Sequence, residues 1–131
     1  MIDDKDRLVL IKYRMEQAID TIDVVDFLIN SDKLAVAVNR IYYGLYYSVT
    51  ALAINNGFET SKHAQLIGWF NKEFVATKLT DPKFGKILKN AFQNRTKGDY
   101  DAYVTFQKDE VFQMYYEMIE FINEIKRLIE I

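Results

Sequence analysis

Apolar residues recur every three or four positions along most of the chain, and this pattern contains a single proline, Pro82. Such spacing places the apolar side chains on one face of an α-helix. Three long stripes of this kind are present: Leu8, Ile11, Met15, Ile22, Val25 and Ile29; Leu34, Val38, Ile41, Leu45, Ser48 and Leu52; and Val111, Tyr115, Met118, Ile122, Ile125 and Ile129. The pattern predicts an all-α fold with long helices.

Residues typical of helix ends divide the chain into five helical segments. We expect the first helix to end at Asn30 and Ser31 and the second to end at Gly57, which suits a left-handed C-cap. Thr60 or Ser61 would cap a short third helix that contains Ile67, Phe70 and Phe74. The fourth helix would begin at Asp81 and Pro82 and end at Lys97 and Gly98, and a fifth would run from about Gln107 to the end of the chain. Short connections between long helices predict an antiparallel up-and-down four-helix bundle with an additional short helix. We expect a single domain over residues 1–131.

Composition narrows the classes of protein to which the chain could belong. Half of the residues are hydrophobic and there is no cysteine, so we expect a packed core without disulfides or thiolate metal sites. No uninterrupted apolar run approaches the roughly 18 to 20 residues needed to span a bilayer, and nothing near the N-terminus resembles a signal sequence. We expect a soluble, cytoplasmic protein. Its net charge of -2 gives no reason to expect avid nonspecific binding of nucleic acid.

The predicted second helix is apolar on nearly every side. Beyond its main stripe it carries further apolar and aromatic residues on two other faces: Ala35, Tyr42, Tyr46, Val49 and Ala53, and then Tyr43 and Tyr47. A helix of this kind is normally buried on nearly every side. A second copy of the chain in a two-fold homodimer would cover the excess, or the tyrosine hydroxyls would reach water at the rim of one monomer's core. The pattern alone leaves both alternatives open.

Several familiar catalytic sites lack their residues. A carboxylate-bridged di-metal bundle needs two Glu-x-x-His pairs, but the chain has one histidine, His63, with Thr60 three positions before it. A phosphate-binding P-loop fails because Thr80 stands where the glycine before Gly85 and Lys86 is required. We therefore predict no metal and no cofactor. A lone histidine at a helix start is weak support for a Ser/His/Asp triad and is first interpreted as structural.

One line of the second helix carries Arg40, Tyr43 and Tyr47, because steps of three, four and seven return to the same helix face. An arginine flanked by tyrosines can clamp a phosphate or stack on a base. It can also simply lie on the aromatic rings in solvent, and for this line alone we favour that interpretation.

The fourth helix ends its apolar face on a charged residue. Arg95 follows Leu88 and Ala91 on the same line one turn later, and an inward arginine requires a carboxylate partner or a bound anion. Asp99 is close enough in sequence to orient or neutralise Arg95, and we expect Tyr100 to pack beside the two. If Asp99 holds Arg95 in a salt bridge, the motif is a structural relic of a catalytic one. If Asp99 turns away, Arg95 forms an anion site.

Positive charge is concentrated on the same helix. Residues 82–97 contain five basic and no acidic residues, whereas the rest of the chain has twelve basic and nineteen acidic ones. Lys86 and Lys89 are the candidates here for contacts to phosphate. Short runs of lysine also commonly do no more than solvate the outer face of a helix.

Two stretches together carry a resemblance to the HEPN family, specifically to small prokaryotic HEPN proteins. They are "AVAVNRIYYGLYYSVTALAINNGFETSKHAQLIGWF" and "LKNAFQNRTKGDYDAY", with an Arg-Tyr-Tyr helix, a Lys-His after the next turn and a later Arg-x-x-x-Asp-Tyr, and they cover most of the chain from Ala35 to about Tyr103. The resemblance implies a helical bundle that is usually dimeric. It also implies a nucleotidyltransferase partner in a toxin-antitoxin pair, and metal-independent ribonuclease activity in those members that act as toxins.

The chain departs from the motif of the family's ribonucleases, which is an arginine, four to six residues and then a histidine. Counted from Arg95, the histidine would stand at Tyr100, Asp101 or Ala102. RNA cleavage without metal needs proton transfer near neutral pH, which a phenol with a pKa of about 10 performs poorly. The remaining candidates for proton transfer are His63, if the fold brings it near Arg95, and Tyr100.

Three functions therefore remain as hypotheses. The leading one is a HEPN-type bundle that binds a nucleotide, RNA or a nucleotidyltransferase partner, within a toxin-antitoxin or defence-type system. The alternatives are a metal-independent endoribonuclease toxin and a non-catalytic dimerising adaptor.

Overall fold

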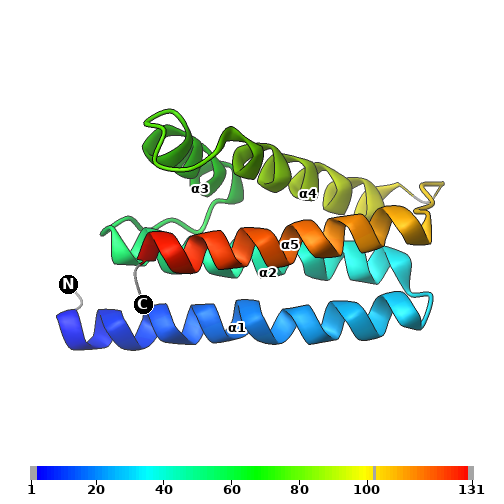
Figure 1. Cartoon of the computed structure of the whole chain (residues 1–131), viewed down its shortest axis with the longest axis horizontal. Helices are drawn as coiled ribbons and strands as arrows, with labels where there is room; N and C mark the ends of the chain where they lie inside the picture. The colour runs from blue at the N-terminus through cyan, green and yellow to red at the C-terminus, as the bar shows by residue number, and fades with distance from the viewer. Residues whose placement is uncertain (1–2, 102, 130–131) are drawn as a thin grey trace.

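The structure is a computed structural model that describes residues 3–101 and 103–129, and helices make up nearly all of them (Figure 1). In chain order these are α1 (Asp4–Asn30), α2 (Leu34–Asn55), α3 (His63–Phe70), the π-helix η1 (Asn71–Val75), α4 (Pro82–Tyr100) and α5 (Lys108–Ile129). Helices α1, α2, α4 and α5 alternate in direction, and the start of α1 lies at the same end of the molecule as the end of α5. The predicted antiparallel four-helix bundle with an additional short helix is confirmed.

Helix α2 is the centre of the bundle and packs against α1, α3, α4 and α5. Its buried residues lie on every side: Ala37, Val38, Ile41, Tyr42, Gly44, Leu45, Ser48, Val49, Ala51, Leu52, Ala53 and Ile54. Of the residues beyond its main stripe, Tyr42, Val49 and Ala53 are buried by helices of the same chain, whereas Tyr43, Tyr46 and Tyr47 are partly exposed and Ala35 is exposed. The single chain therefore covers only part of the apolar excess.

Most of the predicted helix limits agree with the structure. α1 ends at Asn30, Gly57 follows α2 with a φ of 77°, and α5 begins at Lys108. Asp81 caps α4 by accepting a hydrogen bond from the backbone N–H of Lys83 at 2.9 Å. The predicted continuation of the fifth helix through residues 130–131 lies outside the described residues.

Two local predictions about α3 were wrong. α3 begins at His63 after Lys62, so neither Thr60 nor Ser61 is its N-cap; the Thr60 hydroxyl instead accepts the backbone N–H of Lys62 at 3.1 Å. Phe74 lies in the π-helix and not in α3.

Gly98 does not end the fourth helix, because α4 continues to Tyr100. A Cβ atom on Gly98 would lie 3.2 Å from the ring of Phe106. The glycine therefore permits a close approach of the segment before α5, where the sequence suggested a helix stop.

Among the described residues, none of the helices combines the length and the apolar character needed to cross a bilayer.

Candidate functional site

His63, the first residue of α3, is held between two tyrosines of α2. The hydroxyl of Tyr42 lies 2.7 Å from Nδ1 of His63. The ring of Tyr46 stacks on the imidazole with their centroids 4.3 Å apart and their planes 14° apart. Because Tyr42 and Tyr46 are four residues apart, one face of α2 presents both rings to the start of α3.

The Tyr42 hydroxyl bond fixes which ring nitrogen of His63 carries the proton. Tyr42 is completely buried, and this burial raises the pKa of its hydroxyl, so the phenol keeps its proton. Within the described part of the chain, Nδ1 of His63 is the one acceptor within hydrogen-bond distance of that hydroxyl. Tyr42 therefore donates to Nδ1, and neutral His63 carries its own proton on Nε2.

Arg95 enters the same cluster from α4. Its guanidinium carbon lies 5.1 Å from the centroid of the Tyr42 ring, 5.5 Å from that of Tyr43 and 5.6 Å from that of Phe92. Cations are attracted to the faces of aromatic rings, so these three rings receive a charge that an aliphatic core would not. The pKa of His63 is lowered, first by burial and then by the positive charge of Arg95.

A chain of polar contacts joins Arg95 to α2. Nη1 of Arg95 lies 3.6 Å from Oδ2 of Asp99, which is an ion pair but longer than a hydrogen bond. Nδ2 of Asn39 donates to both oxygens of Asp99, at 3.1 and 3.3 Å. Oδ1 of Asn39 in turn accepts from Nε and Nη2 of Arg40, at 3.0 and 2.8 Å. The guanidinium of Arg40 also lies over the ring of Tyr43, 4.7 Å from its centroid.

We refer to these residues as the Arg95 cluster: Asn39, Arg40, Tyr42, Tyr43, Tyr46, His63, Phe92, Arg95 and Asp99. Its charges are two guanidiniums and one carboxylate, and Nε2–H of His63 is a further donor. Nε of Arg95 is buried and has no hydrogen-bond acceptor among the described residues. A buried donor without an acceptor is unfavourable, and an anionic oxygen would satisfy it well. The composition of the cluster therefore suits an anion.

The burial and pairing predicted for Arg95 are confirmed, since its side chain is only 13% exposed and it forms an ion pair with Asp99. The structure brings Arg40, Tyr43 and His63 to the same place. Tyr47 lies at the edge of the cluster, with its ring centroid 6.2 Å from that of Tyr43.

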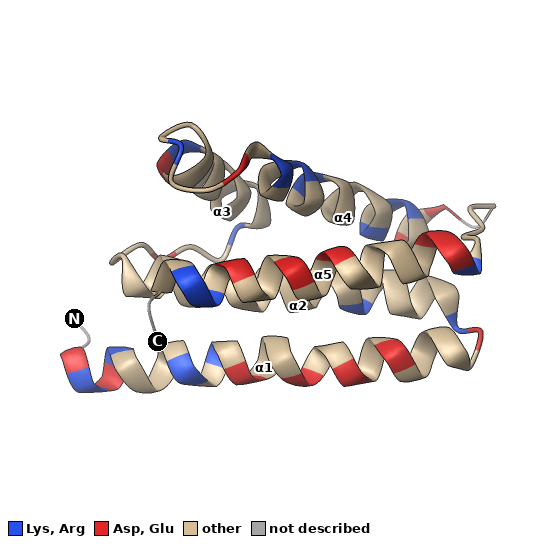
Figure 2. Ribbon diagram, in the orientation of Figure 1, with Lys and Arg blue, Asp and Glu red and all other residues tan. Residues whose placement is uncertain are grey.

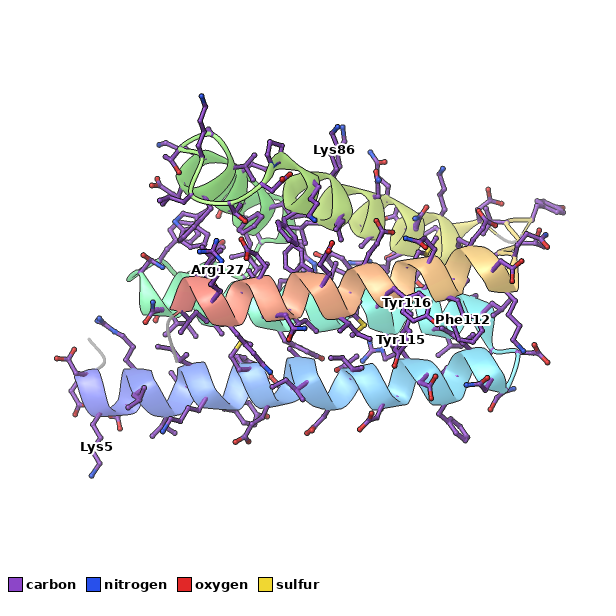
Figure 3. All side chains as sticks on the ribbon, in the orientation of Figure 1. Lys5, Lys86, Phe112, Tyr115, Tyr116 and Arg127 are labelled. Carbon is purple, nitrogen blue, oxygen red and sulfur yellow. The ribbon has the colours of Figure 1, made fainter. Side chains whose placement is uncertain are left out.

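Three candidates do not join the cluster. Tyr100 is 79% exposed, so the expectation that it packs beside Arg95 was wrong. Lys86 precedes Arg95 by nine residues, which is two and a half helical turns and therefore the opposite side of α4. Lys86 points away from α2 and α5 (Figure 3), and Lys89 is also exposed. Figure 2 shows lysine and arginine along α4 and acidic residues along α1 and α5.

Sequence reasoning missed Asn39, Tyr42, Tyr46 and Phe92 as members of the site. The i, i+4 spacing of Tyr42 and Tyr46 was visible, but it was interpreted as an extra apolar face that a second copy would cover or whose hydroxyls would reach water. Their contact with His63 depends on the path of residues 56–62 between α2 and α3, which spacing along one helix does not reveal.

Among residues 3–101 and 103–129, no group of three or more His, Asp or Glu side chains is arranged so that it could hold a metal ion. Asp101 is exposed, and Ala102, the last position where the motif histidine would stand, lies outside the described residues.

Comparison with known proteins identifies relatives over nearly the whole chain. The family model described as "HEPN domain" matches residues 11–128. A UPF0332 protein of Thermotoga maritima is 36% identical over 121 residues, which is 92% of each chain. Two proteins of Methanocaldococcus jannaschii, named "Putative toxin MJ0142" and "Putative toxin MJ0605", are 30% and 29% identical. The match to MJ0142 covers 86% of this chain and 77% of that relative. The match to MJ0605 covers 72% of this chain and 69% of that relative.

Proposed function

The chain belongs to the HEPN domain family, and we propose that it is a toxin-like member that holds a phosphate group of RNA or of a nucleotide at the Arg95 cluster. Arg95 and Nε2–H of His63 supply the donors. Arg40 supplies a second positive charge from α2, and the partly exposed ring of Tyr47 is available for base stacking.

The observation that carries this proposal is the hydrogen bond between Tyr42 and His63. It keeps Nδ1 as an acceptor that is already occupied and leaves Nε2 as a donor. A general base must offer a free lone pair, and in this tautomer His63 offers none. The site as built is therefore suited to binding an anion and poorly suited to removing a proton.

A ribonuclease is the second candidate, because the fold brings His63 into contact with the same aromatic rings as Arg95. Cleavage requires His63 to release Nδ1 from Tyr42 or to carry a second proton and act as an acid. If the protein is a ribonuclease, it should cut RNA in the presence of a chelator, and His63→Ala should abolish the cutting. In our proposal wild-type cleavage is negligible.

The ion pair between Arg95 and Asp99 is the arrangement expected from the sequence if the motif is a relic; our proposal instead treats Asp99 as an internal competitor for the phosphate. At 3.6 Å its contact with Arg95 is weak, and its two oxygens are also held by Asn39. A phosphate that binds Arg95 would compete with this internal carboxylate. Asp99→Asn keeps the shape of the side chain but removes that competition, so we expect it to strengthen binding. If the motif is a relic, neither the wild type nor Asp99→Asn should bind phosphate.

The test is fluorescence anisotropy with a labelled single-stranded RNA at low salt, together with competition by a mononucleotide. We expect Arg95→Ala to weaken binding of both about 10- to 100-fold, which is the effect of losing a charge-assisted hydrogen bond of about 1.5–3 kcal/mol. Equal binding by wild type and Arg95→Ala would overturn the site assignment.

Lys86→Ala with Lys89→Ala is the matched control on the same helix. These exposed lysines lie away from Arg95, so they would contact a different part of a long RNA. We expect the double variant to lower the log-log salt slope for RNA by about one unit per lost contact. It should not change the affinity for a mononucleotide.

Partnership is proposed on the resemblance and on the toxin names of two relatives. A nucleotidyltransferase-type antitoxin encoded beside this chain would form a complex that survives size exclusion. If purified protein binds neither RNA nor nucleotide yet forms this complex, the non-catalytic adaptor is the better description.

A further inference from the structure

A cavity of about 270 Å³ lies between α2, α4 and α5. Its apolar floor comes from Val38, Ile41 and Leu45 of α2, which are all buried. α4 and α5 both lie over α2 (Figure 1), and they form the walls. The volume is near the lower end of the range for small-molecule sites, about 300 Å³. It suits a molecule with one ring system.

Three amide side chains line the walls, Asn90 and Asn94 from α4 and Gln113 from α5. Within the described chain none of these three makes a side-chain hydrogen bond, in contrast to Asn39, whose amide is fully engaged with Arg40 and Asp99. Each amide offers both donors and acceptors. Asn90 and Gln113 are exposed and Asn94 is partly buried, so the rim of the cavity presents amides that are free to exchange water for a ligand.

Glu117 of α5 adds a carboxyl group that lacks a donor. It is partly buried, and it forms no ion pair or side-chain hydrogen bond with the residues that the structure describes. Its pKa is raised, first by burial and then by the nearby charge of Glu120. Glu110, the other carboxylate at this cavity, already accepts the backbone N–H of Gln107 at 3.0 Å. Glu117 is thus the group to which a ligand's donors would contribute most.

We propose that this cavity binds a planar ring of nucleobase size whose edge carries two adjacent N–H donors. The ring would pack against Ile87, Ala91 and Met114, its paired donors would bind the carboxylate of Glu117, and its other heteroatoms would bind the amides. A carboxylate accepts two parallel N–H bonds well. This donor pair occurs on the Watson–Crick edge of guanine and on a free aromatic amidine, so guanosine and benzamidine represent two sources of the same chemistry.

The cavity and the proposed phosphate site use different side chains of α4. Asn94 and Arg95 are consecutive in α4 and so project about 100° apart around the helix. Arg95→Ala should therefore leave the cavity intact, which separates a failure of this inference from a failure of the proposed function. The carboxylates at the cavity also disfavour a phosphate there.

The experiment is a titration of ¹⁵N-labelled full-length protein with guanosine, inosine and benzamidine, followed by amide chemical shifts. Inosine lacks the exocyclic amine of guanosine and so offers one donor where guanosine offers the pair. We expect saturable shifts confined to residues 87–94 and 110–117, with guanosine binding at least about tenfold more tightly than inosine if the source is a nucleobase. Saturation by benzamidine alone would identify an organic cation as the source.

Glu117→Gln keeps the size of the side chain and tests the role of the carboxylate. We expect it to weaken binding about 10- to 100-fold, while Arg95→Ala binds as wild type does. Thermal unfolding of both variants establishes that they are folded. The proposal is overturned if no probe shifts these residues, or if Glu117→Gln binds equally well. The proposal is also overturned if the amide shifts of residues 87–94 and 110–117 change with protein concentration and not with any probe, because the cavity is then an interface between copies of this chain.

Discussion

At the scale of single residues, His63 determines what the Arg95 cluster can do. Its imidazole is placed by a hydrogen bond from Tyr42 and by stacking on Tyr46. Burial and the charge of Arg95 both lower its pKa from the usual 6.5. At neutral pH His63 is therefore an uncharged hydrogen-bond donor, and the positive charge of the cluster comes from its arginines.

Replacing Arg95 by alanine should raise the pKa of His63, because one of the two causes of its depression is removed. It should not restore the ordinary value, since the contribution from burial remains. His63 is the single histidine of the chain, so its ring signals can be followed by NMR without ambiguity. Lys86→Ala, on the far side of α4, is the charge-matched control and should leave the titration unchanged. An unchanged pKa in Arg95→Ala would show that the two side chains do not interact.

The same shift predicts how stability depends on pH. The unfolded chain has the higher histidine pKa, near 6.5, so it binds the proton first as the pH falls. The free energy of unfolding should therefore decrease as the pH falls from about 6.5 to the folded-state pKa, and this contribution should level off below it. His63→Gln has no titrating ring, and its denaturation midpoints should lack this component. An identical pH dependence in wild type and His63→Gln would contradict the shift.

At the scale of helices, the π-helix η1 determines how α3 and α4 meet. A Cβ atom on Gly85 of α4 would lie 2.7 Å from Oδ1 of Asn71 and 3.2 Å from Cγ2 of Val75, both in η1. π-helical turns are rare and often occur at functional sites. Here the glycine lets the two segments approach closely at the end of the bundle, and so it helps to position α3 and His63.

Two glycines of this region should respond in opposite ways to replacement by alanine. Gly85→Ala should destabilise the protein by about 1–3 kcal/mol, because the short Asn71 and branched Val75 side chains cannot easily move aside. Gly68 lies in α3, and a Cβ atom there would have no neighbour within 4 Å. Gly68→Ala should therefore stabilise by up to about 1 kcal/mol through helix propensity. Urea denaturation measures both, and a stabilising Gly85→Ala would show that the contact is not tight.

How far the sequence predicts each helix depends on how local the determining signal is. The end of α1, the turn at Gly57 and the Asp81 cap follow from residues within a few positions, and they agree with the structure. The prediction that Gly98 ends α4 was wrong, because this glycine makes room for Phe106, which lies beyond the end of the helix. The π-helix has no periodic signal of its own, so it could not be read from spacing.

In the candidate site, too, features set by local sequence were predicted and features set by long-range contacts were not. The inward position of Arg95 followed from its register with Leu88 and Ala91 along a single helix. The hydrogen bond of Tyr42 to His63 joins residues 21 positions apart, and the Asn39–Asp99 contact joins residues 60 apart. Such contacts depend on the packing of α2 against α3 and α4, which no pattern within one helix specifies.

At the scale of the whole molecule, two observations bear on assembly. Of the α2 residues that suggested a second copy, Tyr42, Val49 and Ala53 are buried within the chain, whereas Tyr43, Tyr46 and Tyr47 remain partly exposed. Tyr100 and Tyr103, which follow Arg95 and Asp99 in the sequence, are 79% and 95% exposed. The support for a homodimer therefore comes partly from the half-buried tyrosines of α2 and more strongly from the end of α4 and the segment after it.

We expect a homodimer whose interface includes the segment from Arg95 to Tyr103, because exposed aromatic side chains commonly form the centre of protein interfaces. Light scattering behind a sizing column should give about twice the chain mass of 15.4 kDa at tens of micromolar. Tyr100→Ser combined with Tyr103→Ser should shift the protein to monomer. Tyr116→Ser is the matched control, because Tyr116 is a comparably exposed tyrosine of α5 at 59%. A wild-type monomer would contradict the dimer, and a monomer produced by Tyr116→Ser alone would place the interface on α5 instead.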